Sequence, residues 1–302
     1  MEEKGAPLVS IIMNCYNGEQ YLRFAIESVI AQTYSNWEII FWDNQSTDSS
    51  AEIFKSYKDN RFKYYYAKKH SVLYDARNYA IKKCNGELIA FLDVDDAWLS
   101  DKLKIQVALM QDENIGLSCT NYIMLNERNL DQIKTYAVYP SLPFGSVLND
   151  IFREYFVHMS TLLVRKKAID QLEYIFDPRF NIIGDLDFVI RLCKDWDVAT
   201  VQTPVAYYRF HNNNTGNKAG FVMVDEYDIW EADLINDIEF QKYENFQLLI
   251  HKMRMYKVFK LLYDGKRLEA ITISQELGIK FRLKTIVAAM LPRYVVRRYF
   301  YS

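Results

Sequence analysis

The stretch ELIAFLDVDDAWL, residues 87–99, is an apolar run that ends abruptly in three carboxylates. The five residues after Glu87 are apolar, which predicts a short buried strand at 87–92. Asp93, Asp95 and Asp96 follow that strand within four positions. Carboxylates held so close together repel one another, so they need solvent, a helix N-terminus or a cation nearby. The stretch therefore predicts an acidic site at the end of a core strand.

Buried strands alternate with helices along the first 115 residues. Apolar β-rich runs and helical periodicity predict strands at 7–13, 37–42, 61–66 and 87–92, and helices at 17–34, 51–57, 71–83 and 101–112. This alternation is typical of an α/β fold with a mostly parallel, Rossmann-like sheet covered by helices on both faces. Asn17, Ser71 and Ser100 precede three of the helices and are expected to cap them.

Polar residues directly follow three of the predicted strands, namely Asn14, Asp43 and Asp93. In open parallel sheets, ligands bind outside the carboxyl ends of the strands. We therefore expect these three side chains to project into one crevice, which would be the binding site.

The alternation stops near residue 116. The segments 158–169 and 198–211 suit an antiparallel extension that forms a wall of the crevice. The polar, turn-rich stretch 212–220 precedes a region from Val224 onward in which only helical patterns occur. The sequence thus predicts an α/β domain at 1–222, with halves at about 1–115 and 116–222, and a helical C-terminal region at 223–302.

Composition and charge fit a globular protein. Half of the 302 residues are hydrophobic and a quarter are charged, so the chain can bury a sizeable core. The formal net charge of −2 gives no basic field for nucleic acid. The cysteines Cys15, Cys84, Cys119 and Cys193 have neither metal-binding nor redox spacing. No signal peptide or membrane span is evident, so a cytoplasmic protein is expected.

Four stretches resemble, in order and spacing, the family 2 glycosyltransferases, which share the GT-A nucleotide-sugar fold. They are VSIIMNCYNGEQYLRFAIESVIAQTY (9–34), EIIFWDNQSTDSS (38–50), DARNYAIKKCNGELIAFLDVDD (75–96) and GDLDFVIRL (184–192). The resemblance covers about residues 7–215 and leaves the C-terminal third uncovered. It implies a nucleotide-diphosphate sugar donor, a divalent metal (Mn²⁺ or Mg²⁺) and inversion at the anomeric carbon.

The resemblance also implies roles for residues of the crevice. It places the nucleotide near Asn14, Tyr16, Asp43 and Asn44. Arg77 and Asn78 would border the donor. Asp93 would lie near the ribose and the metal, and Asp95 would be the firmest metal ligand. Asn44 and Gln45 stand where the family often has Asp followed by Gly. Because Asn both donates and accepts hydrogen bonds, whereas an ionised Asp only accepts them, the resemblance does not determine which nucleobase is bound.

Transfer to a hydroxyl needs a general base, since a hydroxyl is a weak nucleophile. The resemblance implies Asp185 for this role, in the acidic pair of NIIGDLDFVIRL (181–192). Gly184 stands where the family often has Glu, and Asp187 competes for the role. From the residues alone, the simpler role of Asp185 is to cap a helix at 187–194.

Histidine His211 lies in YYRFHNNN (207–214). The resemblance implies that a Tyr-Arg-x-His stretch closes the donor site and that His211 contacts the metal or a phosphate. A single histidine is also common as a packed or surface residue. The same alternative holds for His158, which the resemblance puts near the acceptor.

The segment KFRLKTIVAAMLPRYVVRRYF (280–300) carries six Lys and Arg residues and no acid. Apolar and aromatic residues lie between the charges, and Pro292 is expected to break or kink a helix. A basic amphipathic segment can lie in an anionic membrane interface. A helix docked on its own domain and a contact in a homodimer are alternatives that the sequence leaves open.

Together these features predict an inverting, metal-dependent glycosyltransferase of polysaccharide biosynthesis, peripheral to the inner face of the cell membrane. It would move a sugar to a hydroxyl of a glycan or lipid-linked oligosaccharide. One alternative is an inactive scaffold of a glycan-assembly complex, against which Asp93, Asp95 and Asp185 speak. Another is a sugar nucleotidyltransferase, but NCYNGEQ (14–20) lacks the Gly-rich phosphate loop of that class.

Overall fold

The computed structural model describes residues 5–126, 133–136, 141–211, 214, 221–292 and 295–296. Its contacts divide the chain into two compact units. The first unit comprises Met1–Ile151 and Tyr155–Asn214, and the second comprises Phe152–Glu154 and Thr215–Ser302. The strands belong to the first unit, whereas the described part of the second unit is helical.

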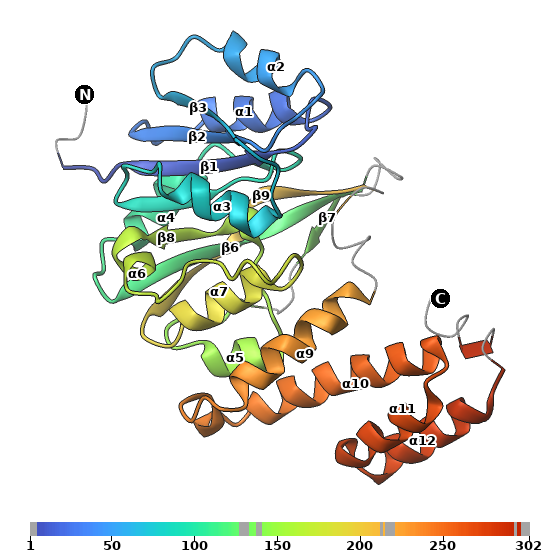
Figure 1. The fold of residues 1–302 in the computed structure, drawn as a ribbon. Helices are drawn as coiled ribbons and strands as arrows, with labels where there is room; N and C mark the ends of the chain where they lie inside the picture. Colours follow the sequence, from blue (N-terminus) through green and yellow to red (C-terminus); the bar gives the residue numbers. More distant parts are fainter. Residues whose placement is uncertain are drawn as a thin grey trace. The chain divides into compact units, whose positions relative to one another are not determined.

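The first unit is built on one mixed sheet of nine strands in the order β3-β2-β1-β4-β8-β6-β9-β5, with β7 paired to β6 (Figure 1). The strands are β1 Val9–Cys15, β2 Trp37–Asp43, β3 Phe62–Tyr66, β4 Leu88–Phe91, β5 Ala97–Trp98, β6 Ile115–Asn126, β7 Ile133–Tyr136, β8 Leu163–Arg165 and β9 Asp197–Phe210. Strands β1 to β4 pair in parallel, and β8 joins β4 in antiparallel. The α/β class is confirmed. The extension after residue 116 is mixed rather than antiparallel throughout, because β8 pairs antiparallel with β4 and β6, whereas β9 pairs in parallel with β6.

Helices cover both faces of this sheet. They are α1 Leu22–Ile30, α2 Ser50–Ser56, α3 Leu73–Ile81, α4 Lys102–Leu109, α5 Leu148–Arg153, α6 Lys166–Asp170 and α7 Gly184–Leu192, with a 3₁₀ turn at Met159–Thr161. Phe41 of β2 stacks on Phe54 of α2, while its neighbour Trp42 stacks on Tyr79 of α3. Because successive strand side chains point to opposite faces, α2 and α3 lie on opposite faces of the sheet.

Apolar periodicity explains why the helices pack where they do. In α1, Leu22, Ala25, Ile26 and Val29 recur at helical spacing and are fully buried. They join Val9, Ile11 and Met13, the alternate residues of β1, in one hydrophobic core. The apolar face of the helix, which repeats every 3.6 residues, packs here on the apolar face of the strand, which repeats every second residue.

The predicted caps were wrong. Helices α1, α3 and α4 begin at Leu22, Leu73 and Lys102, and none of the three predicted residues caps them. In the first turn of α4, the N–H of Leu103 instead donates to Gln32 Oε1 at 3.0 Å. Asn17 adopts a left-handed conformation with φ of 54°, and its Oδ1 instead accepts a hydrogen bond from the N–H of Thr47 at 2.8 Å. The N–H of Ser71 donates to Asn44 Oδ1 at 3.2 Å. These polar side chains tie together the loops at the strand ends.

The second unit contains α9 Val222–Leu234, α10 Phe246–Asp264, α11 Arg267–Ser274 and α12 Ile279–Met290, with 3₁₀ turns at Phe240–Lys242 and Gln275–Leu277. Gly265 ends α10 in the left-handed conformation, with φ of 80°. Leu261 and Leu262 of α10 pack with Ala270 of α11 and Ala289 of α12. None of the described helices is both long and apolar enough to cross a bilayer.

Candidate active site

The loop that follows β4 gives its three carboxylates different surroundings. Asp96 is buried, and it accepts hydrogen bonds from the Ser160 hydroxyl at 2.5 Å and from the N–H of Arg209 at 2.9 Å. The same hydroxyl accepts a hydrogen bond from the N–H of Asp93 at 3.2 Å. Burial raises the pKa of Asp96 well above its usual range, and the charges of Asp95 and Asp93 add to the effect. Asp96 therefore anchors the loop rather than facing the crevice.

Asp95 faces the end of β9. Its Oδ2 lies 3.0 Å from Nε2 of His211, and its backbone carbonyl accepts a hydrogen bond from Arg209 Nε at 2.9 Å. The His211 ring stacks on Tyr21 with centroids 5.2 Å apart. Burial and the neighbouring charge of Asp93 raise the pKa of Asp95, and the hydrogen bond to His211 opposes them. A partly exposed carboxylate and an imidazole thus converge on one point.

These two side chains fit a divalent cation that a substrate helps to hold. Within the described ranges, no group of three His, Cys, Asp or Glu side chains converges to form a complete metal site. Mg²⁺ and Mn²⁺, however, are commonly held by one or two carboxylates together with substrate phosphates. Asp95 and His211 offer one oxygen and one nitrogen, which suits a site completed by a diphosphate.

Arg77 of α3 links the acidic loop to a second carboxylate. Its guanidinium is buried, and Nη2 lies 2.6 Å from Asp93 Oδ1. It also interacts electrostatically with Asp185, at the start of α7. An arginine that is always charged therefore interacts with both Asp93 and Asp185 and lowers the repulsion between them.

Asp185 lies in the first turn of α7 and receives several hydrogen bonds. The hydroxyl of Tyr74 donates to Oδ1 at 3.2 Å, and that of Tyr155 donates to Oδ2 at 3.4 Å. The N–H of Leu186 donates to Oδ1 at 2.9 Å. Burial raises the pKa of Asp185, while Arg77 and the hydrogen bonds from Leu186 and Tyr74 lower it. A raised pKa favours a carboxylate as a proton acceptor near neutral pH.

Asp187, the alternative candidate for the general base, is in a different environment from Asp185. It is buried, and its Oδ2 accepts hydrogen bonds from Arg191 Nε at 2.9 Å and Nη2 at 2.7 Å. The guanidinium of Arg191 also donates to the carbonyls of Tyr174 and Ile175. This ion pair holds α7 to the preceding loop, which is a structural role.

The predicted nucleotide-binding residues cluster at the ends of β1 and β2. Tyr16 is exposed, and its ring lies 4.5 Å from that of His70. Asp43 is fully buried and accepts hydrogen bonds from the N–H of Ser46 at 2.7 Å and from the Tyr64 hydroxyl at 2.6 Å. Of these residues, only Tyr16 presents a side chain openly to solvent.

The amide side chains named in the sequence are buried or already hydrogen-bonded. Asn14 has a buried amide with no hydrogen-bond partner among the described residues. Asn44 donates to the carbonyl of Ser71 at 2.8 Å. Asn78 donates to the carbonyl of Phe176 at 2.8 Å and accepts a hydrogen bond from its N–H at 3.0 Å. Asn44 and Asn78 thus hold loops, and their contact with a donor stays a prediction.

The sequence profile described as Glycosyl transferase family 2 matches residues 10–172, which is more than half of the chain. The chain belongs to glycosyl transferase family 2.

Curated relatives of this family 2 glycosyltransferase include bacterial enzymes. The UDP-Glc:alpha-D-GlcNAc-diphosphoundecaprenol beta-1,3-glucosyltransferase WfgD of Escherichia coli is 38% identical over 41% of this chain and 49% of its own length. A match to the E. coli enzyme of the same description, WfaP, is 30% identical and covers 68% of this chain and 78% of WfaP. The putative teichuronic acid biosynthesis glycosyltransferase TuaG of Bacillus subtilis (strain 168) is 29% identical over 69% of this chain and 81% of TuaG.

Solved structures share the fold of this family 2 glycosyltransferase. TarS 1-349 of S. aureus in complex with UDP-GlcNAc superposes with a TM-score of 0.68 at 15% identity, covering 96% of this chain and 91% of that one. The mannosyltransferase PcManGT of Pyrobaculum calidifontis, in complex with GDP-Man and Mn²⁺, gives 0.62 at 14% identity, covering 95% and 87%. The GT-A fold expected from the sequence is therefore confirmed.

Several residues of the site were not singled out by sequence reasoning. Ser160 joins Asp93 to Asp96, and Tyr74 and Tyr155 contact Asp185. A serine or tyrosine in an apolar segment carries no spacing signal, and each partner lies far away along the chain. His158 packs against the rings of Tyr122 and Tyr208, and burial lowers its pKa to about 4. This neutral ring matches the packed alternative.

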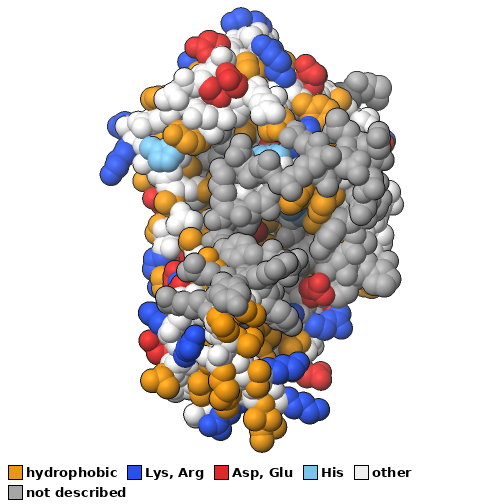
Figure 2. Space-filling view, turned by 90° about the vertical axis from the view of Figure 1, so that its right-hand side faces the viewer, with side chains coloured by type: hydrophobic (Ala, Val, Ile, Leu, Met, Phe, Trp, Pro, Cys, Tyr) orange, Lys and Arg blue, Asp and Glu red, His pale blue; other side chains and the backbone are white. Residues whose placement is uncertain are grey.

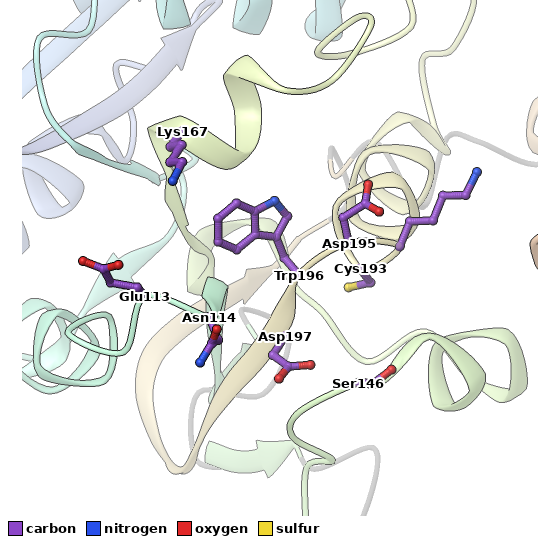
Figure 3. Close-up of a pocket in the computed structure, with 9 residues that line it drawn as sticks. Glu113, Asn114, Ser146, Lys167, Cys193, Asp195, Trp196 and Asp197 are labelled. Atoms are coloured by element: carbon purple, nitrogen blue, oxygen red, sulfur yellow. The ribbon is translucent and has the colours of Figure 1, made fainter.

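A polar hollow of about 460 Å³ lies elsewhere on the first unit. Its lining comprises Glu113, Asn114, Ser146, Lys167, Cys193, Lys194, Asp195, Trp196 and Asp197 (Figure 3). Asp197 begins β9, whereas Arg209 and His211 lie at its other end. The extended strand between Asp197 and Arg209 spans roughly 40 Å. The hollow is therefore separate from the acidic loop.

Proposed function

We propose that this family 2 glycosyltransferase transfers a sugar with inversion from a nucleotide-diphosphate donor to a hydroxyl of a lipid-linked glycan acceptor. The observation that carries the proposal is the link made by Arg77. This buried arginine pairs with Asp93 of the acidic loop and interacts with Asp185, which supports a single site that uses both carboxylates. Tyr16, Asp43 and Asn44 at the ends of β1 and β2 suit the nucleotide.

The acidic loop would hold a divalent metal through Asp95 and His211, with Asp93 beside the ribose. When bound, Mn²⁺ or Mg²⁺ supplies neutralisation of the charge that develops on the leaving diphosphate. Support comes from the short distance between the two side chains and from the Mn²⁺ in the PcManGT complex, a protein of the same fold. Asp96, Ser160 and Arg209 would keep the loop in place.

Asp185 would act as the general base. It accepts the proton of the acceptor hydroxyl while the acceptor oxygen bonds to the anomeric carbon. The bond between that carbon and the phosphate oxygen breaks, and the nucleoside diphosphate leaves. A single displacement of this kind inverts the anomeric configuration. The supporting observations are the burial of Asp185 and its contacts with Tyr74, Tyr155 and Leu186.

The relatives support a proposal for the acceptor class. WfgD and WfaP are described as acting with UDP-Glc on an alpha-D-GlcNAc-diphosphoundecaprenol, and TuaG as taking part in teichuronic acid biosynthesis. We therefore propose a glycan on a polyisoprenoid diphosphate as acceptor and polysaccharide assembly as the process. This would bring the enzyme to the inner face of the cell membrane, where a contact through residues 280–302 would hold it.

A donor panel tests the proposal. The purified chain is incubated with UDP-, GDP- and dTDP-sugars, with and without Mn²⁺, and with a synthetic GlcNAc-diphospholipid. Release of nucleoside diphosphate coupled to a product of inverted configuration, seen by NMR, is expected for one donor. Release of pyrophosphate instead would indicate a nucleotidyltransferase. Donor binding without turnover on any acceptor would indicate a scaffold.

A further inference from the structure

Helix α12 carries an apolar stripe on its outer side. Ile279, Leu283, Val287 and Met290 are 75%, 58%, 60% and 76% exposed. Their spacing of four, four and three residues puts them on one face of the helix. A row of four exposed apolar side chains on one helix is unusual for a face that meets only water.

The opposite face of α12 packs against its own unit. Phe281, Thr285 and Ala289 follow one another at four-residue spacing, and they are buried or partly buried. Phe281 and Ala289 belong to the core that includes Leu261 of α10. Since the inner face already fixes the helix, the outer stripe is not needed for folding of the described unit.

Cations flank the stripe on both sides. At 100° per residue, Lys280 and Lys284 fall on one border of the stripe and Arg282 on the other. All three are exposed, and residues 279–292 contain no acid. Figure 2 shows orange side chains gathered over the C-terminal helices at its lower end, with blue Lys and Arg side chains beside them.

We propose that this face of α12 docks on an anionic lipid bilayer, with the stripe among the acyl chains and the three cations at the headgroups. Apolar residues bordered by Lys and Arg are the pattern of a helix that lies in a membrane interface. A second copy of the chain is a poorer occupant, because a two-fold contact would set each basic border against another. The inference rests on the proposed function in that a polyisoprenoid-linked acceptor is held in a bilayer.

The sequence alone suggests that the whole segment 280–302 contacts the membrane. The structure restricts the proposed contact to the outer face of α12. Arg293, Arg297 and Arg298 of that segment lie outside the described residues. Removing the whole segment would also remove Phe281 and Ala289 from the core of the unit. Point variants on the outer face are therefore the sharper test.

The experiment is sedimentation of the full chain with vesicles of about 3:1 phosphatidylcholine to phosphatidylglycerol, against vesicles of phosphatidylcholine alone. The stripe variant is Leu283→Gln with Val287→Gln. The charge variant replaces Lys280, Arg282 and Lys284 with Gln. The matched control is Ile238→Gln, an apolar residue of the same unit that is 70% exposed and outside α12.

The wild type and the control should pellet with the anionic vesicles. The charge variant should lose about fivefold in partition coefficient for each cation removed, and added salt should weaken the wild type in the same way. The partition coefficient of the stripe variant should be at least tenfold lower than that of the wild type at low salt. At high salt, the stripe variant should also retain less binding than the wild type. Equal pelleting of all four proteins would overturn the proposal. A change from dimer to monomer in the stripe variant, seen by light scattering without vesicle binding, would assign the face to a second copy.

Donor chemistry separates this inference from the proposed function. Both variants should release nucleoside diphosphate from a soluble donor at the wild-type rate, since no α12 residue belongs to the site. Transfer to an acceptor embedded in vesicles should fall, whereas transfer to a short-chain soluble acceptor should not. If the protein binds vesicles but transfers no sugar, the proposed function is wrong, whereas the proposed membrane-docking face of α12 is retained.

Discussion

His211 and Asp95 meet with 3.0 Å between Nε2 and Oδ2, although they are 116 residues apart along the chain. The contact joins the loop after β4 to the end of β9. Arg209 reinforces it, because its N–H binds Asp96 and its Nε binds the carbonyl of Asp95. These contacts hold the loop after β4 against the end of β9, although the two segments are far apart in the sequence. The proposed metal would bind at this contact.

Replacing Asp95 with Asn should abolish the effect of Mn²⁺ on donor binding. Asn keeps the size of the side chain and can still hydrogen-bond to His211, but it lacks the negative charge that a hard cation prefers. The measurement is calorimetric titration of the nucleoside diphosphate with and without Mn²⁺. Asp170→Asn, which removes an exposed carboxylate paired with Lys166, is the control and should behave as the wild type. A variant at Asp95 that kept the full metal response would remove that residue from the metal site.

Replacing Asp185 with Asn should leave donor binding intact and slow transfer by about a hundredfold or more, which is a common contribution of a general base. Asn cannot accept the proton, yet it can still bind Tyr74 and Leu186. Single-turnover transfer and donor titration separate the two effects. Transfer close to the wild-type rate would rule out Asp185 as the base.

The matched comparison is Asp187→Asn in the same helix. Asp187 is buried in an ion pair with Arg191, so the substitution should lower the free energy of unfolding by about 2 kcal/mol or more. The folded fraction should transfer sugar at nearly the wild-type rate, because Asp187 pairs with Arg191, which in turn binds the carbonyls of the loop at 174–175. Loss of transfer in a folded, stable Asp187 variant would instead move the base role to that residue.

Removing the Tyr74 hydroxyl should shift the pH dependence of transfer. The base works only when deprotonated, so the rate falls as the pH drops through its pKa. Tyr74 donates a hydrogen bond to the Asp185 carboxylate and lowers that pKa, so Tyr74→Phe should move the acidic limb of the pH profile to higher pH. Tyr155→Phe should have a smaller effect, because its hydroxyl is farther away, at 3.4 Å. An acidic limb that stays put in both variants would contradict this account of the base.

The sequence predicts the frame of the site better than its details. The apolar runs that become β1, β2 and β4 are local signals, and the residues after them must share one edge of the sheet. Asp95 and His211 were paired through the family resemblance, since no local rule connects positions so far apart. The roles of Asn78 and Tyr155 depend on partners at Phe176 and Asp185, which only the folded chain brings near.

The failed caps show the same limit. Asn17 and Ser71 are good capping residues by type, but the loops at 44–47 offer them other partners. Tertiary hydrogen bonds between loops outweighed a local preference that is typically worth about 1 kcal/mol. Such competition cannot be read from one segment alone.

Lys102 should make the first unit less stable near neutral pH. It is fully buried in α4, and its Nζ has no hydrogen-bond partner among the described residues. The Nζ atom lies 4.1 Å from the centroid of the Trp98 ring. Burial lowers the pKa of Lys102 from 10.5 to about 7. The Cys119 thiol beside it has a pKa raised by burial to about 12, so it stays neutral over the same range.

The sign of the pH dependence follows from proton counting. Between the folded pKa of about 7 and the unfolded value of 10.5, the unfolded chain binds a proton that the folded chain does not. The contribution of Lys102 to the free energy of unfolding therefore rises with pH through this window. Below it, both states are charged and the full cost of burying the ammonium remains.

Lys102→Met should accordingly raise the free energy of unfolding by about 1–4 kcal/mol near pH 7, with a gain that shrinks toward pH 10. Urea unfolding followed by tryptophan fluorescence at several pH values measures it. Lys104→Met is the control, because Lys104 is exposed on the same helix and should change neither stability nor its pH slope. Equal pH slopes for the wild type and Lys102→Met would mean that the buried amine does not titrate in this window.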